Sequence, residues 1–154
     1  MHKIEILPYS ETLKPYFDSI NRAWVEELFS IEPFDQQQLE NPEQYVLEKG
    51  GRIIFASLDG EIVGTVGLAK VDEQTYEMIK MGVAKSAQGK GVGMVLGKAI
   101  LQEAKEMGAQ KVILYTHSKL QAALKIYEKL GFQEVQVCSD KYQRCDLAME
   151  LLLE

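Results

Sequence analysis

A glycine-rich stretch between residues 83 and 108, VAKSAQGKGVGMVLGKAILQEAKEMG, carries the clearest chemical signal in this sequence. Gly89, Gly91 and Gly93 fall where a helical pattern begins, although glycine in a helix costs about 1 kcal/mol relative to alanine. A glycine turn between a strand and a helix exposes consecutive backbone N–H groups at the positive end of the helix dipole, where anions bind. The stretch therefore predicts a phosphate-binding site.

Three nucleotide-binding motifs use such a turn, and two of them do not fit. The Walker loop GxxxxGK[ST] fails because Gly89-Lys90 is followed by Gly91. The dinucleotide motif GxGxxG fails because no glycine stands three residues after Gly91 or Gly93. The remaining motif, Q/R-x-x-G-x-G/A, is satisfied by Gln88, Gly91 and Gly93.

The elements that must position this turn are indicated by hydrophobic periodicity and by turn residues such as Asp59-Gly60, a strong hairpin signal. In chain order they are a strand in KIEILPY, helices over 12–29 and 35–48, strands in RIIFASL, EIVGTVGLAKV and TYEMIKMGV, a helix ending at 107, a strand in KVILYTH, a helix in KLQAALKIYEKL, and strands in FQEVQV and LAMELLL. This order predicts a mixed sheet, mostly antiparallel, with helices on both faces.

Two further expectations concern the elements that flank the glycine-rich helix. Because a helix joins TYEMIKMGV to KVILYTH, the two strands should run parallel through a right-handed crossover. KVILYTH is almost continuously apolar, which predicts burial on both faces. The residues expected to face the core from the helix between them are Val95, Ala99, Leu101 and Ala104.

With these motifs in order, the sequence resembles the GNAT N-acetyltransferase superfamily, whose members bind the pyrophosphate of acetyl-coenzyme A with the Gln88–Gly93 type of turn. ALKIYEKLGF is similar to the family signature A-x-x-L-Y-x-k-x-G-F, and the resemblance covers about residues 52–137 well. It implies an α+β, GNAT-like fold in a single domain over 1–154. That fold has a mostly antiparallel six- to seven-stranded sheet, a central splayed parallel strand pair, and about four helices on both faces.

The resemblance implies acetyl-CoA as co-substrate and no metal. The residues implied to bind it are Met81, Gly82 and Val83 on the strand, Gln88, Gly89, Lys90, Gly91, Val92, Gly93 and Met94 in the turn and helix start, and Ser118, Leu120 and Ala123 beyond the next strand. Leu120 departs from the family pattern, which often has an asparagine there that contacts the pantetheine arm. Ser118 and Lys119 lie near enough to contribute in its place.

The implied reaction is direct attack of a primary amine on the acetyl thioester. The amine, with a pKa near about 10, must lose a proton, the developing oxyanion needs a donor, and the leaving thiolate benefits from protonation. By resemblance, Glu77, eleven positions before Gln88, is the candidate base. A water relay is the alternative to it. The backbone N–H of Val83 is the candidate oxyanion donor, and Tyr127 occupies the position of the acid.

Plainer interpretations of the two catalytic candidates stay open. Glu77 is equally consistent with an exposed strand residue paired with Lys70 or Lys80. Tyr127 shares a helix face with apolar residues, so it also fits a tyrosine packed between helix and sheet. At the level of the whole chain, the rival hypotheses are a catalytically silent CoA-binding or regulatory module and a phosphate-binding α/β protein outside the superfamily.

The first helices are expected to build the acceptor pocket. Trp24 and Phe34 supply aromatic surface there, and Glu27 is placed to attract an ammonium group. The acceptor is a small-molecule amine or a protein amine, with a slight preference for the small molecule because no extended groove for a peptide is evident. Dimers are common among similar proteins, so a homodimer is an open alternative.

Composition narrows the remaining classes. The 154 residues carry a net charge of −6 without a basic stripe, which disfavours nucleic acid as a partner. The apolar runs are far shorter than the roughly 18 residues of a membrane helix, and the N-terminus has no signal-peptide pattern, so a cytoplasmic protein without membrane contact is expected. The two cysteines, Cys138 and Cys145, lack the second pair that a zinc site needs and are predicted to be reduced thiols.

Overall fold

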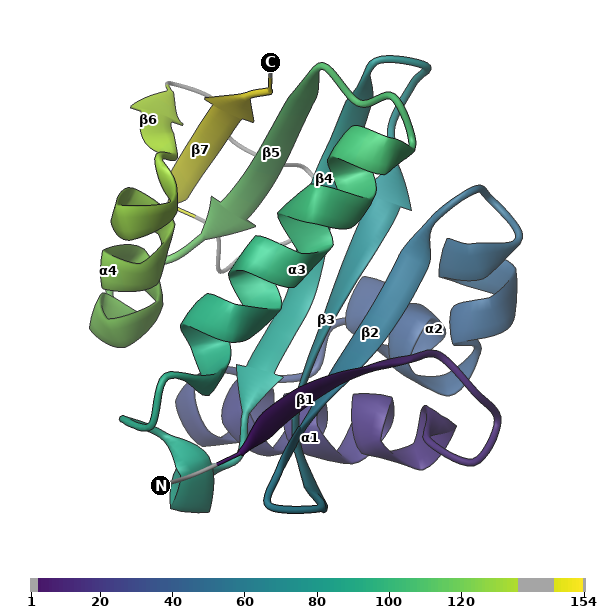
Figure 1. The fold of residues 1–154 in the computed structure, drawn as a ribbon, viewed down its shortest axis with the longest axis vertical. Coiled ribbons are helices and arrows are strands. Elements are labelled where there is room, and N and C mark those ends of the chain that lie inside the picture. The colour runs from purple at the N-terminus through teal and green to yellow at the C-terminus, as the bar shows by residue number, and fades with distance from the viewer. Residues whose placement is uncertain (1–2, 136–145, 154) are drawn as a thin grey trace.

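The structure is a computed structural model that describes residues 3–135 and 146–153. Its centre is a seven-stranded sheet in the order β1-β2-β3-β4-β5-β7-β6 (Figure 1). The strands are β1 (Ile4–Pro8), β2 (Arg52–Leu58), β3 (Glu61–Lys70), β4 (Thr75–Val83), β5 (Lys111–Thr116), β6 (Gln133–Val135) and β7 (Leu147–Leu152). Every neighbouring pair is antiparallel except β4 and β5, whose parallel pairing confirms the predicted crossover.

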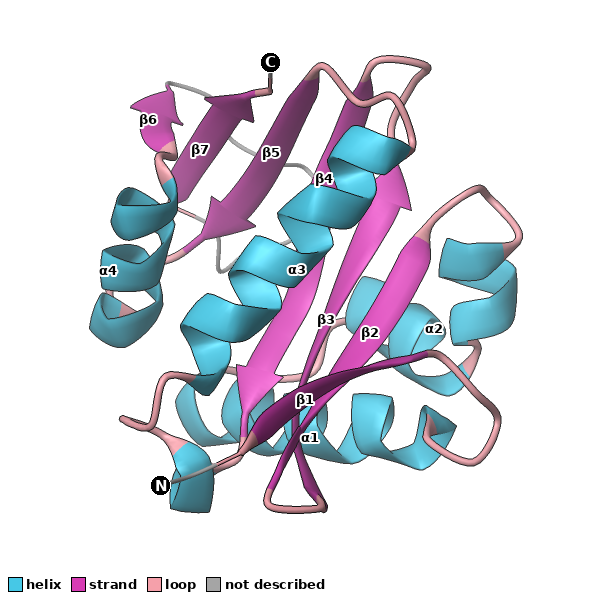
Figure 2. Cartoon of the chain, in the orientation of Figure 1, coloured by secondary structure: helices cyan, strands magenta, loops and turns pink. Residues whose placement is uncertain are grey.

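Helices cover both faces of this sheet. They are α1 (Lys14–Leu28), α2 (Pro33–Glu40), the short π-helix η1 (Glu43–Leu47), the 3-10 turn η2 (Lys85–Ala87), α3 (Val92–Glu106) and α4 (Gln121–Leu130). Figure 2 shows α3 in front of the sheet with α4 beside it, whereas α1 and α2 lie behind. The mixed α+β architecture is thus as predicted. Within the described residues, no helix has the length and apolar character needed to cross a membrane.

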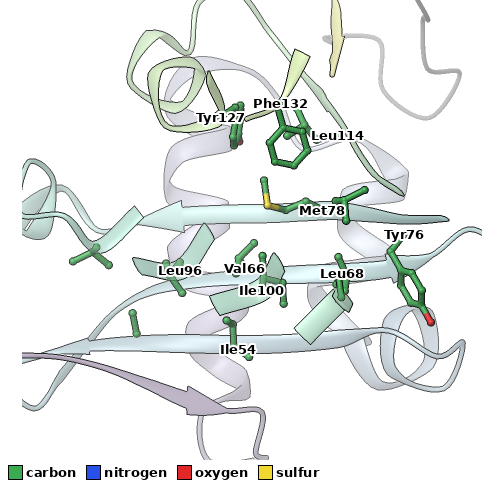
Figure 3. Packing of buried hydrophobic residues seen from close by; sticks show 14 of the residues in the cluster. Ile54, Val66, Leu68, Tyr76, Met78, Leu96, Ile100, Leu114, Tyr127 and Phe132 are labelled. Atoms are coloured by element: carbon green, nitrogen blue, oxygen red, sulfur yellow. The ribbon is translucent and has the colours of Figure 1, made fainter. Parts of the chain in front are cut away.

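The larger hydrophobic core lies between the sheet and α3 (Figure 3). Leu96 and Ile100, both fully buried, are the central contacts of α3, and Val92 and Ala104 extend their stripe. The predicted stripe was partly wrong. Ala104 is buried, and half-buried Ala99 and Leu101 pack against this core, but Val95 is not among the described residues packed there. Helical periodicity predicts the spacing of the residues that face the core. It does not predict which side of the helix faces the core when apolar residues occur on several sides.

A second, smaller core lies on the opposite face, under α1 and α2. Phe17 of α1 and Leu39 of α2 pack there with Phe55 of β2 and Ile79 of β4. This core fixes the first helices against β2, β3 and β4, and leaves β5 outside their cover.

The burial of β5 differs from the prediction that both of its faces are enclosed. Val112, Leu114 and Thr116 are buried on the side of α3 and α4, but Ile113 and Tyr115 on the other side are only half-buried. The reason is the position of α1, which packs on β3 and β4 rather than on β5. One face of β5 is therefore open to a cavity.

Candidate active site

The two central strands, β4 and β5, separate along most of their length. Their parallel pairing covers only Thr75–Glu77 against Lys111–Ile113. Beyond that point β4 runs on to Val83 and β5 to Thr116 without pairing to each other. The edge of β4 that faces β5 is therefore open, as the predicted splayed pair requires.

A cavity of about 740 Å³ occupies this opening. Its wall includes Trp24 from α1, on one face of the sheet, and Tyr127 from α4, on the other. Between them it is bordered by the open edge of β4 and by the glycine turn that precedes α3. The cavity thus passes through the sheet, in the size range of small-molecule and cofactor sites.

The glycine turn owes its composition to backbone geometry. Gly89 and Gly91 have φ angles of +80° and +86°, and a Cβ atom at either would meet nothing within 4 Å. Left-handed backbone, rather than lack of space, therefore selects glycine at both positions. Position 93 requires glycine for a different reason. A Cβ atom there would lie only 2.6 Å from Cδ1 of Ile126, where α3 and α4 approach closely.

The start of α3 has the properties of an anion site. Gly91 is its N-cap residue, no described side chain caps it, and its first turn contains no acidic residue. The first N–H groups of a helix lack partners within the helix and attract negative charge. Nε2 of Gln88 donates a hydrogen bond of 3.2 Å to the carbonyl of Val83, which ties the turn to the end of β4. These residues fit a phosphate-bearing ligand.

Glu77 lies at the inner end of the cavity. It is the last residue of β4 that pairs with β5, and its residue exposure is only 2%. The alternative of an exposed strand residue is therefore wrong. Glu77 is instead a buried residue on the cavity wall.

Tyr127 borders the cavity from α4. It is 8% exposed, and its ring packs edge-on against Phe132 with 6.1 Å between the ring centroids (Figure 3). Its hydroxyl forms no hydrogen bond with another described residue. Burial raises the pKa of the phenol from 10 to about 12, because the charged form is poorly solvated there. The side chain is thus a neutral hydrogen-bond donor at physiological pH.

The other predicted site residues divide into those on the cavity wall and those away from it. On the wall are Trp24, Glu27, Met81, Gly82, Val83, Gln88, Gly89, Gly91, Val92, Gly93, Met94, Leu120 and Ala123. Phe34, Lys90 and Ser118 are absent from the described lining. Ser118 instead donates from Oγ to Oδ2 of Asp146 at 2.7 Å, and its hydrogen bonds hold the pKa of that carboxyl below its usual value.

Two lysines border the cavity beside the C-terminal end of α1, and neither is predicted from the sequence to act on the acceptor side. Lys85 lies 2.9 Å from the Glu27 carboxylate. Nζ of Lys119 donates to the carbonyl of Leu28 at 3.2 Å and lies 4.7 Å from the ring centroid of Phe29. These contacts hold the end of α1 beside the cavity mouth. The sequence gives little indication of these contacts, because a lysine on a loop usually extends into solvent without a specific partner.

His117, at the end of β5, also borders the cavity, but its hydrogen bonding makes it unsuitable as a base. Its Nδ1 accepts a hydrogen bond of 3.0 Å from the backbone N–H of Lys119. The Nε2 atom lies 3.6 Å from Oδ2 of Asp146, which favours the proton on that nitrogen. Neither ring nitrogen offers the cavity a free lone pair in this arrangement.

Thr116 contains the single unpartnered buried side-chain polar atom of the described residues, Oγ1. Because an unsatisfied buried hydroxyl is destabilising, Thr116→Val is expected to raise the free energy of unfolding by about 1 kcal/mol or more. Thr65→Val is the matched control. Oγ1 of Thr65 donates to the carbonyl of Ile54 at 2.9 Å, so this variant should lose about 1 kcal/mol. Urea unfolding measures both, and a loss of stability in Thr116→Val would contradict the assignment.

The described residues hold no group of three or more His, Cys, Asp or Glu side chains placed to bind a metal ion. Cys138 and Cys145, predicted to be reduced thiols, lie outside the described residues.

Comparison with known proteins finds a match over most of the chain. The model of the acetyltransferase (GNAT) family matches residues 13–132. N-acetylaspartate synthetase of Rattus norvegicus is 36% identical over 102 residues, which are 65% of this chain and 34% of that protein. N-acetyltransferase 8 of Rattus norvegicus is 30% identical over 95 residues, covering 58% of this chain and 43% of that protein. The chain thus spans about a third of the length of the first of these relatives.

Solved structures share the fold over nearly the whole chain. A GNAT-family acetyltransferase from Staphylococcus aureus Mu50 superposes with a TM-score of 0.87 at 24% identity, covering 99% of this chain and 100% of that one. The protein yncA from Salmonella typhimurium, solved with its cofactor acetyl-CoA, gives a TM-score of 0.78 at 19% identity, covering 98% of this chain and 94% of that one. At identities this low, the superpositions show that the fold is shared and nothing further.

Proposed function

The chain belongs to the acetyltransferase (GNAT) family, and from that premise we propose that it is an acetyl-CoA-dependent N-acetyltransferase acting on a primary amine. The observation that carries the proposal is the cavity between β4 and β5. Its wall includes the uncapped start of α3 as well as the buried residues Glu77 and Tyr127. Transfer of an acetyl group from a phosphate-bearing donor to an amine requires an anion site and groups that accept and donate protons. Residues of both kinds border this cavity.

The binding residues divide along the cavity. In this proposal the backbone N–H groups of Gly91, Val92 and Gly93 bind the pyrophosphate of acetyl-CoA, which supplies the activated acetyl thioester; the uncapped start of α3 on the cavity wall supports this. The edge of β4 from Met81 to Val83 is proposed to pair with the amide-bearing arm, in the manner of an added strand, and its lack of pairing with β5 supports this.

The proposed proton transfers balance. An acceptor that arrives as an ammonium releases one proton to solvent before it reacts. As the C–N bond then forms and the C–S bond breaks, two protons move: one leaves the neutral amine and one reaches the sulfur. Glu77 accepts the first, directly or through a water molecule, and Tyr127 donates towards the sulfur. The backbone N–H of Val83 is the candidate donor to the acetyl oxygen as charge develops there. Solvent then returns both side chains to their starting states.

The acceptor is proposed to enter from the α1 side, where Trp24 and Glu27 line the cavity. A small amine is preferred over a protein amine, because the sequence gives no sign of an extended groove or of an acidic run for a basic peptide. Aspartate belongs in a first panel of amines, because a similar protein is named N-acetylaspartate synthetase.

Thermal unfolding with and without ligand tests the proposal. At about 100 times its Kd, acetyl-CoA is expected to stabilise the protein by about 2.7 kcal/mol. ADP, which lacks the pantetheine arm, serves as the comparison ligand, and desulfo-CoA tests the contribution of the sulfur. A shift with acetyl-CoA well beyond that with ADP supports the proposed donor, and turnover of the amine panel then separates an enzyme from a silent CoA-binding module. No shift with either ligand at millimolar concentration would remove both functions.

A further inference from the structure

Lys80 marks an irregularity in β4 on the wall of the cavity. Thr65 of β3 pairs with Gly82, but Gly67 pairs with Ile79, so Lys80 and Met81 together oppose one residue of β3. The φ angle of Lys80 is +51°, in the left-handed region that side chains other than glycine rarely adopt. A strained backbone of this kind persists only where the surrounding structure enforces it, and it often marks a functional site.

The side chain of Lys80 forms a buried ion pair. Nζ of Lys80 lies 2.6 Å from Oδ1 of Asp35, and the two side chains are 2% and 0% exposed. The other oxygen of Asp35 accepts a hydrogen bond of 3.0 Å from the backbone N–H of Glu32, as part of the capping box that begins α2. Lys80 is thus tied to a carboxylate that is itself fixed by the start of a helix.

The ion pair acts at the place where β4 turns away from β5. Pairing with β5 ends at Glu77, three residues before Lys80, and the open edge follows. Gly82, two residues later, lies against α1, because a Cβ atom there would be 3.0 Å from Cγ2 of Ile20 and from Cδ1 of Trp24. Contacts on both sides of Met81 therefore hold the backbone of the open edge.

We propose that Asp35 and Lys80 are positioning residues: their ion pair holds the left-handed backbone of Lys80 and thereby aims the open edge of β4 into the cavity. They act through the backbone and not by contact with the reacting atoms. The inference rests on the proposed function, because the ligand that this edge would hold is the arm of acetyl-CoA. The glycine turn, on a separate segment, should not depend on the pair.

Two double variants separate this role from a contribution to folding alone. Asp35→Leu with Lys80→Met replaces the ion pair by apolar side chains, a change that buried pairs often tolerate. Asp35→Leu with Lys80→Gly also removes the pair, but glycine adopts a positive φ without strain. The measurements are kcat, KM for acetyl-CoA and the Kd of ADP, with the wild type alongside.

The methionine variant is expected to lose about 100-fold in kcat, the effect of a small misplacement in an active site, with the Kd of ADP unchanged. The glycine variant should recover most of this loss. Equal activity of both variants and the wild type would overturn the proposal, as would equal weakening of ADP and acetyl-CoA. Should neither double variant fold, Asp35→Asn must show the same selective loss of kcat. A wild type that binds acetyl-CoA no better than ADP would instead reject the proposed function.

Discussion

Tyr127→Phe is expected to lower kcat by about 10²- to 10⁴-fold, the range found when a positioned proton donor is removed. The change deletes one oxygen atom and leaves the ring packed against Phe132, so the fold and the affinity for acetyl-CoA should be preserved. Steady-state kinetics at saturating acetyl-CoA measure the effect. An unchanged kcat would remove the role of Tyr127 as acid and leave it as a packing residue.

A matched control is Tyr76→Phe. Tyr76 lies on β4, is 4% exposed, and is absent from the described cavity wall, so its loss of a hydroxyl should leave kcat unaltered. The pKa of Tyr127 also predicts the pH profile. Burial raises that pKa to about 12, so the neutral donor form persists, and kcat should not decline from phenol ionisation up to about pH 10. A decline near pH 10 that disappears in Tyr127→Phe would contradict the raised pKa.

Asp35→Ala is expected to lower the free energy of unfolding by about 3–5 kcal/mol, because it removes one partner of a buried ion pair. The Lys80 ammonium, 2% exposed, would then lose the carboxylate 2.6 Å away without gaining water. The capping box of α2 would lose one of its two hydrogen bonds in the same step. Urea unfolding of the purified variant measures the loss.

Glu5→Ala provides the comparison for an exposed pair. Glu5 lies 3.5 Å from Lys3, and the side chains are 52% and 77% exposed, so this variant should stay within about 0.5 kcal/mol of the wild type. If Asp35→Ala loses no more than Glu5→Ala, the lysine must relax to solvent and the ion pair cannot be enforcing the backbone of β4.

Local signals in the sequence predicted most of the fold. Asp59 and Gly60 have φ angles of +52° and +89°, so the Asp-Gly turn forms the tight hairpin that its residues favour. Gly131, at +104°, ends α4 as a helix-terminating glycine does. The predictions that were wrong depend on tertiary contacts. Which side of α3 faces the core, and why one face of β5 is only half-buried, depend on where the helices pack, and local sequence patterns do not encode that packing.

The candidate site was predictable to a different degree at each position. Gln88, Gly91 and Gly93 were found from their spacing, and the structure gives the glycines a conformational or packing reason. Lys80 was missed as a site residue, although a charge within the apolar strand TYEMIKMGV was its signal. Its left-handed backbone depends on Asp35, which is 45 residues earlier in the chain, so only the folded structure brings the two together.

The short pairing of β4 with β5 bears on how long the protein survives in a cell. Only three paired positions join the strands β1 to β4 with the strands β5 to β7. Cooperative unfolding of these two halves of the sheet therefore depends largely on α3 and on any ligand bound between β4 and β5. A ligand seated there would supply the missing edge contacts and suppress partial opening, the event that exposes chains to proteases. The amount of this protein in the cell would then follow the concentration of acetyl-CoA. When acetyl-CoA is scarce, the reaction would lose enzyme as well as substrate.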